Sequence, residues 1–328
     1  MLSQRKKKLL TATLTIGITA YLIYRVYSEA SKIEIRSSQL LSPYLFLALL
    51  LGIAGYLIYT TLWHIYLTHL VDVEFKRVLL ANLSGTYLSF SFNAAIGTLI
   101  KVKFIGASYF QVLATNLAGV ATELMVGSAM LVFLMHDWGA LLTFLFFLLT
   151  FIADNRVYHV LVPVLSRIRA GGISEEFYAG WHAARSRADR VLAALILGAL
   201  LILINAGVLM SVGMAFGISI PLGDAIKAIL YSTVLGSVLG TPGGIGGNEL
   251  GVLMAIGNTG LNVLIAFTFK FLNQYLFALV GAVAFYRSVL TEVGVKDLTD
   301  EGKGKLDESH ERSPEGSGEE NKEAGSRA

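Results

Sequence analysis

The sequence contains no cysteine, which excludes disulfide bonds, thiolate metal sites and cysteine nucleophiles. Charged residues are also scarce: they make up 15% of the 328 residues, whereas soluble domains contain about 25%. Apolar residues take their place, with a hydrophobic content of 55% and a mean hydropathy of +0.64. This balance predicts an integral membrane protein with several spans rather than a soluble domain.

Several kinds of site are also missing from the pattern. The six histidines are scattered without the spacing of metal ligands, and no glycine-rich stretch continues into the Gly-Lys-Ser/Thr of a nucleotide-binding loop. We therefore expect no metal, no cofactor and no nucleic-acid partner, and we do not predict an enzyme. A membrane-embedded transferase is disfavoured because no second carboxylate is near Glu249 in the sequence.

Apolar runs and polar stretches divide the chain into five parts. The N-terminal part holds a first transmembrane helix and an outer loop, the C-terminal part is an acidic tail that is predicted to be disordered, and a basic cytoplasmic loop with six arginines separates two membrane repeats. In order, these parts are residues 1–42, membrane repeat 1 at 43–153, the loop at 154–190, membrane repeat 2 at 191–291 and the tail at 292–328.

The first apolar run, over about 9–27, follows a basic start and also fits a signal peptide. We favour a retained span because the run is long and its end is a poor cleavage site. The other full spans are expected over about 43–69, 110–135, 139–152, 191–216 and 261–287. Basic residues gather on one side of this arrangement, which places both termini in the cytoplasm of a multi-pass cell-membrane protein.

Two apolar segments are interrupted by polar, glycine-containing turns, at 93–98 and at 241–249. Proline and glycine break a helix, and a broken backbone at membrane depth is tolerated only inside protein or beside a cavity. Residues 93–101 can be aligned on 242–250, and the two segments are predicted to enter the membrane from opposite sides. We therefore predict an all-α integral membrane protein with about six transmembrane helices and two opposed re-entrant hairpins in an inverted repeat. Two unrelated glycine-rich kinks are the alternative.

The second turn resembles the Pro-Gly-Gly-x-Gly-x-x-Glu signature of the lysylphosphatidylglycerol synthase transmembrane-region family, also known as the flippase-like domain. The residues that match it are Pro242, Gly243, Gly244, Gly246 and Glu249. The family's first motif is Pro-Gly-Arg-x-Gly-Glu with a basic residue after it, and only Ile96, Gly97 and Lys101 agree with it here. The resemblance covers about residues 9–290 and implies a protein that moves or modifies polar-headed lipids. The loss of the first motif's arginine and glutamate puts a mechanism based on their charges in doubt.

The second turn also supplies most of the predicted substrate-binding residues. Glu249 opens a half-helix with Asn248 as its cap, and one interpretation is a first-turn carboxylate that stabilises the helix N-terminus. A charge at the bilayer centre costs at least about 2.5–3.5 kcal/mol, so we favour a Glu249 that binds a proton, a cation or a lysine. Free backbone donors at a helix start are suited to a lipid phosphate. The residues expected to take part are Gly243, Gly244, Gly246, Asn248 and Glu249, together with Asn93 and Lys101 of the first turn.

Three lysines and one more carboxylate lie in or near apolar segments. Lys101 either faces a lipid phosphate or extends to the headgroup region, and for Lys103 we favour the second fate. Glu123 and Lys270 lie in the spans that follow the two turns, where we expect them to form an ion pair or to take part in transport.

These features predict a flippase-like transporter of a polar-headed lipid, either polyprenyl-phosphate-linked or a phospholipid, with membrane lipids as its partners. The alternative is a non-transporting membrane subunit or scaffold for a separate lipid-modifying glycosyltransferase or synthase.

Overall fold

The computed structural model describes residues 41–152, 171–238 and 241–288. The first predicted span, the acidic tail at 292–328 and residues 153–170 of the predicted loop lie outside this part. The chain divides into two compact units, Met1–Phe285 and Tyr286–Ala328, and the first unit contains all the packing discussed below.

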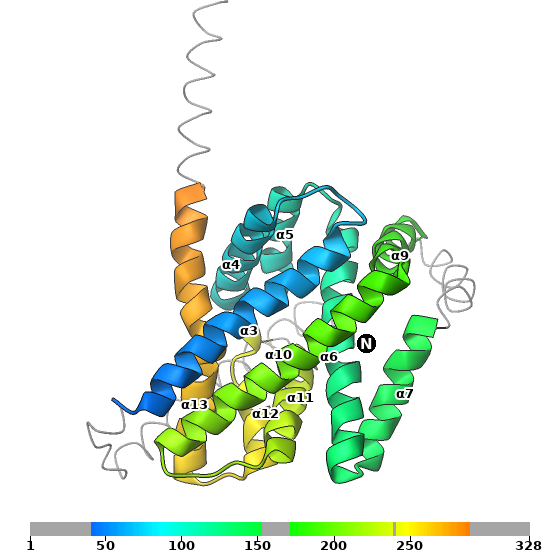
Figure 1. The fold of residues 1–328 in the computed structure, drawn as a ribbon. Coiled ribbons are helices and arrows are strands. Elements are labelled where there is room, and N and C mark those ends of the chain that lie inside the picture. The colour runs from blue at the N-terminus through cyan, green and yellow to red at the C-terminus, as the bar shows by residue number, and fades with distance from the viewer. Residues whose placement is uncertain (1–40, 153–170, 239–240, 289–328) are drawn as a thin grey trace, which may run out of the picture. The chain divides into compact units, whose positions relative to one another are not determined.

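Every element in the described residues is a helix, as the sequence predicts (Figure 1). The elements are α3 (Pro43–Leu67), α4 (Phe75–Ser91), α5 (Ala94–Ile105), α6 (Tyr109–Met135), α7 (Trp138–Ile152), α9 (Gly171–Arg185), α10 (Ala188–Ala215), α11 (Leu222–Val238), the short 3-10 turn η1 (Pro242–Gly244), α12 (Gly247–Ile256), α13 (Gly260–Lys270) and the π-helical turn η2 (Phe271–Tyr275).

Four helices are long and apolar enough to cross a membrane: Pro43–Leu67, Tyr109–Met135, Ala188–Ala215 and the continuous run Gly260–Ser288. Each coincides with a predicted span, because a long apolar run is the strongest signal in a membrane sequence. Helix α7 was also predicted to cross; its 15 residues reach about 22 Å and end at Ile152, where this described part of the chain ends, so the span stays a prediction.

Local sequence sets where these helices begin. Ser42 accepts a hydrogen bond from the backbone N–H of Tyr44 at 3.3 Å, and Pro43 follows at the first helical position of α3. At the start of α6, Ser108 and Gln111 form a reciprocal capping box. These caps satisfy backbone donors that would otherwise be left without partners.

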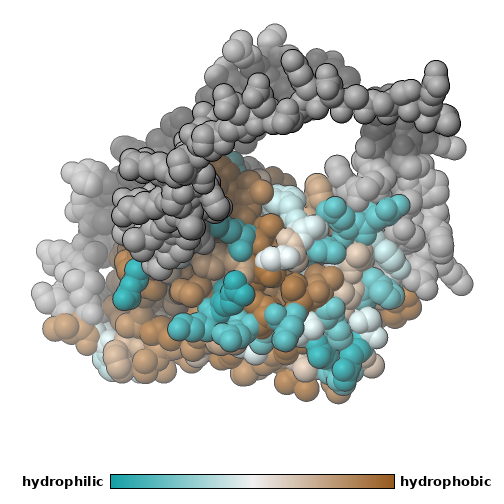
Figure 2. Space-filling model, turned by 90° about the horizontal axis from the view of Figure 1, so that it is seen from above, coloured by the Kyte–Doolittle hydropathy of each residue, from teal (hydrophilic) through white to brown (hydrophobic). Residues whose placement is uncertain are grey.

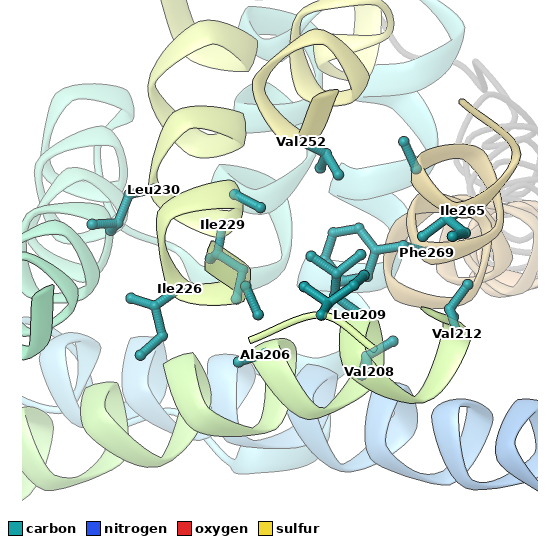
Figure 3. Close-up of a cluster of buried hydrophobic side chains, with 14 of the residues drawn as sticks. Ala206, Val208, Leu209, Val212, Ile226, Ile229, Leu230, Val252, Ile265 and Phe269 are labelled. Atoms are coloured by element: carbon teal, nitrogen blue, oxygen red, sulfur yellow. The ribbon is translucent and has the colours of Figure 1, made fainter. Parts of the chain in front are cut away.

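Helices α3 and α10 lie side by side (Figure 1), and a buried apolar cluster joins α10 to the helices that follow it. Figure 3 shows this cluster, in which α10 contributes Ala206, Val208, Leu209 and Val212, α11 contributes Ile226, Ile229 and Leu230, and Val252, Ile265 and Phe269 come from α12 and α13. This contact fixes the position of α11, α12 and α13 against one long helix.

The same order of elements occurs twice: a long helix, two short helices and a second long helix. The first set is α3 to α6 and the second is α10 to α13. In both sets the two short helices pack against each other. Their contacts depend on glycine: a Cβ atom on Gly97 would lie 2.5 Å from the carbonyl oxygen of Gly85, and one on Gly251 would lie 2.3 Å from the backbone nitrogen of Ser232. Small residues of this kind let helices in membranes approach closely.

Substituting Gly251 by alanine is therefore expected to lower the free energy of unfolding by about 2–3 kcal/mol, because the added methyl group forces α11 and α12 apart. The matched control is Gly119→Ala in α6, where nothing lies within 4 Å of an added Cβ atom. That control should be neutral or stabilising by up to about 1 kcal/mol through its helix propensity. The measurement is unfolding of the detergent-solubilised protein by SDS, followed by circular dichroism. Equal effects of the two substitutions would refute the close packing.

Within the predicted basic loop at 154–190, residues 171–185 form the helix α9, which packs on α6. The reason is an apolar stripe: Phe177, Trp181 and Ala184 recur every three or four residues, so one face of the helix can be buried. Arginine content alone suggested a loop. On the face seen from above in Figure 2, hydrophilic residues, drawn in teal, are mixed with hydrophobic ones.

Candidate functional site

A cavity of about 530 Å³ lies where the two pairs of short helices meet the long helices. This volume falls in the range of small-molecule sites, about 300–1,000 Å³. Residues from both repeated sets line it. The charged and amide residues in its wall are Asn82, Lys101, Glu123, Asn205, Asn248, Lys270, Asn273 and Gln274. A cavity with so many polar groups between apolar helices is a candidate binding site.

The two breaks approach each other at this cavity. Phe90, near the end of α4, lies so close to the second turn that a Cβ atom on Gly243 would be 2.3 Å from its ring. The same ring packs edge-on against Tyr275 of η2 with centroids 5.3 Å apart. Ala94, at the start of α5, also lines the cavity. The second turn therefore packs against the end of α4, just before the first break.

Lys101 lies in the cavity wall. Its Nζ donates a hydrogen bond to Asn116 Oδ1 at 3.1 Å and lies 4.6 Å from the ring centroid of Trp63. Gly85 leaves room for the lysine chain, because a Cβ atom there would be 2.6 Å from Lys101 Cε. Lys103, two residues further along α5, is exposed. Lys101 thus lies in the cavity wall and is held there by Asn116 and Trp63.

Lys270 and Glu123 also line the cavity and are 7% and 8% exposed. The direct ion pair expected between them does not form, since among the described residues no nitrogen–oxygen contact within 4.0 Å joins them. Lys270 Nζ instead lies 5.2 Å from the ring centroid of Phe269, and its charge interacts with both Glu123 and Glu249. One lysine is thus shared between two carboxylates.

Glu249 is fully buried but does not line the cavity. Its Oε2 accepts a hydrogen bond from the backbone N–H of Gly246 at 2.7 Å, and its Oε1 accepts one from the hydroxyl of Tyr275. The Glu249 carboxylate therefore stabilises the turn before α12 by accepting hydrogen bonds inside the protein. The carboxylate predicted to contact a ligand occupies the place at this helix start that an anion would take.

Asn248 was predicted to cap α12, and this is wrong because the helix begins two residues earlier than such a cap implies, at Gly247, with Gly246 in the cap position. The side chain of Asn248 instead lines the cavity. Its Nδ2 donates to the carbonyl oxygen of Gly243 and to Oε1 of Gln274, both at 3.1 Å. Asn248 thereby ties the turn to η2.

The glycines of the turn adopt left-handed conformations, with φ of 60° at Gly243, 73° at Gly244 and 89° at Gly246, which explains their residue type. Two of the three predicted phosphate donors are already used: the N–H of Gly244 donates to the Thr241 carbonyl oxygen at 2.9 Å, and the N–H of Gly246 donates to Glu249. Gly243 and Gly244 lie in the cavity wall, so the main role of the turn is to shape the cavity rather than to offer free backbone N–H groups to a phosphate.

Asn93 lies apart from the other predicted residues. Its Oδ1 accepts a hydrogen bond from the backbone N–H of Ile96 at 2.9 Å, which makes it the cap of α5, and it is exposed. It does not line the cavity. A polar residue just before an apolar helix is typical of a cap, and that signal was available in the sequence.

Sequence reasoning missed the wall formed by α3 and α4. Tyr56, Tyr59 and Asn82 all line the cavity. Asn82 Nδ2 donates to Thr60 Oγ1 at 3.0 Å, and Thr60 donates onward to a backbone oxygen, so the amide is oriented with Asn82 Oδ1 left without a partner. Neutral polar residues inside an apolar run give a much weaker signal than a charge does.

The π-helical turn η2 follows directly after Lys270. A π-helical turn bonds residue i to i+5, so it rotates Tyr275 toward the helix face that holds Lys270, where its hydroxyl reaches Glu249. Asn273 and Gln274 in the same turn line the cavity. Such turns are frequent at functional sites.

Comparison of the chain with protein-family models, with curated proteins and with solved structures finds no match. The resemblance to the flippase-like family therefore rests on the residues of the two turns alone.

Proposed function

We propose that the protein is a membrane transporter that moves the phosphate-bearing headgroup of a lipid through the cavity between its two pairs of short helices. The observation that carries this proposal is the placement of Lys101 and Lys270, from different repeated sets, in the wall of one polar cavity. Charged residues inside a membrane bundle are costly, and they mark ligand or ion pathways by default. Two cations converging on one space are suited to an anion.

The proposed topology supports this role. Helices α4, α5, α11 and α12 contain 17, 12, 17 and 10 residues, so each reaches at most about 26 Å, short of a full crossing. We propose that they form two re-entrant hairpins that enter from opposite sides of a cell membrane, in an inverted repeat with both termini in the cytoplasm. Transporters of this kind bind substrate where their broken helices meet.

The uncharged polar residues that line the cavity indicate which other groups the lipid headgroup contains. The Oδ1 atoms of Asn82 and Asn205 are buried acceptors without a hydrogen-bond partner among the described residues, and both residues line the cavity. A buried acceptor left alone is unfavourable by about 1–3 kcal/mol. A headgroup with hydroxyl or amine donors beside its phosphate would satisfy them. Polyprenyl-phosphate-linked sugars and phospholipids both have this chemistry.

The proposal is tested in vesicles that contain the purified protein and a phosphatidylglycerol with a fluorescent headgroup, with a membrane-impermeant quencher reporting movement between leaflets. Lys101→Met should slow this movement at least about tenfold, since hydrogen bonds to charged groups contribute about 1.5–3 kcal/mol. Lys103→Met, on the same helix but exposed, is the matched control and should keep the wild-type rate. A wild-type rate equal to that of protein-free vesicles would reject the proposal.

The second candidate is a non-transporting subunit or scaffold for a separate lipid-modifying glycosyltransferase or synthase. The observation that favours it is the exposed apolar face of α7, a helix that packs mainly on α6. Its exposed residues are Leu142, Leu145, Phe146, Leu149 and Ile152. Co-purification of such an enzyme, together with no lipid movement by the isolated protein, would favour this function.

A further inference from the structure

Four charged groups meet at the cavity, and their charges balance. Lys101 and Lys270 carry positive charge, while Glu123 in the wall and Glu249 behind it carry negative charge. At a low effective dielectric, an unbalanced charge interacts strongly with its surroundings. If the cavity receives an anionic headgroup, as the proposed function requires, the filled site has one negative charge in excess.

We infer that the site takes up one proton with each anionic headgroup, and that Glu123 is the group that receives it. This inference rests on the proposed function and adds the coupling ion to it. The proton comes from water and forms an O–H bond on a carboxylate oxygen of Glu123, while no bond in the lipid is broken. The filled cavity then has the same net charge as the empty one.

Glu123 receives the proton because Glu249 is already satisfied as a carboxylate. Both oxygens of Glu249 accept hydrogen bonds, from Gly246 and Tyr275, and such bonds favour the charged form of a carboxylate. No hydrogen bond from the described part of the chain reaches Glu123. Glu123 also lines the cavity, where a ligand and water enter, whereas Glu249 does not.

The groups around Glu123 leave Lys270 as its main electrostatic partner. On the other walls, Tyr59 of α3 is close enough to interact with it, and Lys101 of α5 shares the cavity. Helices α10 and α11 contribute neutral residues to the lining, and Lys227 of α11 lies 3.8 Å from Asp137, beyond the far end of α6.

Two further helices, α7 and α9, pack on α6. Helix α7 contains no titratable residue. Helix α9 packs on α6 with Gly180 against Gln111 and Ala114, and Ala184 shares a buried cluster with Ala118. Next to Ala184, the guanidinium of Arg185 donates a hydrogen bond to the carbonyl oxygen of Phe151 in α7.

The test is calorimetric titration of the full-length protein in detergent with dioctanoyl phosphatidylglycerol. Two buffers with different ionisation enthalpies at one pH give the number of protons taken up on binding. We expect about one proton for the wild type and none for Glu123→Gln, which should still bind. Because uptake is linked to binding, wild-type affinity should fall as the pH rises, and that of Glu123→Gln should not. Dioctanoyl phosphatidylcholine, which carries no net charge, should bind without proton uptake.

The outcomes separate the two proposals. Binding of phosphatidylglycerol without proton uptake by the wild type overturns the inference and leaves the proposed function standing. Proton uptake that persists in Glu123→Gln overturns the assignment to Glu123. No binding of phosphatidylglycerol contradicts the proposed function and the inference with it. If Glu123→Gln does not fold, the wild type alone still tests the coupling, because proton uptake with phosphatidylglycerol can be compared with proton uptake with phosphatidylcholine.

Discussion

Substitution of Lys270 by methionine is expected to lower the free energy of unfolding by about 3 kcal/mol and to abolish binding of anionic lipid. Removing one partner of a buried charged set typically destabilises by about 3–5 kcal/mol, because the remaining charge is left uncompensated. Lys270 is 7% exposed and interacts with two carboxylates. The absence of a direct contact places the expected loss at the lower end of the range. SDS titration with circular dichroism measures the stability, and calorimetry measures the binding.

A double variant tests whether the uncompensated charge causes the lost stability of Lys270→Met. Adding Glu123→Gln to Lys270→Met removes one of the unbalanced carboxylates, so part of the lost stability should return, with a coupling energy of about 1–3 kcal/mol. Lys227→Met is the control, because Lys227 and Asp137 are each 28% exposed, and partly exposed ion pairs contribute about 0–1 kcal/mol. If the effects of Lys270→Met and Glu123→Gln on the free energy of unfolding are additive, the two side chains do not interact.

Glu249→Ala is the other single substitution with a large expected effect. It should lower the free energy of unfolding by about 3 kcal/mol. It leaves the buried N–H of Gly246 and the hydroxyl of Tyr275 without their acceptor, at about 1–3 kcal/mol for each unpaired group. Glu249→Gln retains an acceptor oxygen and should lose less stability. Glu249 is behind the cavity wall, and Glu249→Gln removes one negative charge from the set around the cavity. The folded glutamine variant is therefore expected to bind anionic lipid at least as tightly as the wild type, whereas sequence reasoning placed this carboxylate in the binding site.

The same two readouts, SDS unfolding and lipid titration, check this prediction. Glu74→Ala is the matched control, because Glu74 is exposed and its side chain makes no capping hydrogen bond, so its loss should change stability by at most about 0.5 kcal/mol. If Glu249→Gln folds well but no longer binds lipid, Glu249 takes part in lipid binding and the prediction is wrong. Unchanged stability of Glu249→Ala would show that its two hydrogen bonds are unimportant.

The long apolar helices were predictable, because length and hydropathy act over twenty residues at once and local errors average out. The breaks at Asn93 and Pro242 were also predictable, since proline, glycine and asparagine act locally on the backbone. Helix α9 was not, because counting arginines hides an apolar stripe on the other face of a helix. Its amphipathic spacing at Phe177, Trp181 and Ala184 was the signal to use.

The site was predictable at Gly243, Gly244 and Asn248 of the second turn and where a charge stands in an apolar segment. Lys101, Glu123 and Lys270 drew attention for that reason, and all three line the cavity. The direction of a side chain within a turn is set by packing, so the sequence of the second turn could not place Glu249 behind the wall. The π-helical turn after Lys270 has no sequence signature, yet it brings Tyr275 to Glu249.

The central claim is that Lys101 and Lys270 hold a lipid phosphate in the cavity between the two pairs of short helices. Native mass spectrometry of the purified protein tests it most directly, because this measurement detects and identifies retained lipid. We expect a phosphate-bearing lipid on the wild type and on Lys103→Met, and its loss from the double variant Lys101→Met/Lys270→Met. Equal retention of that lipid by the folded double variant would contradict the claim.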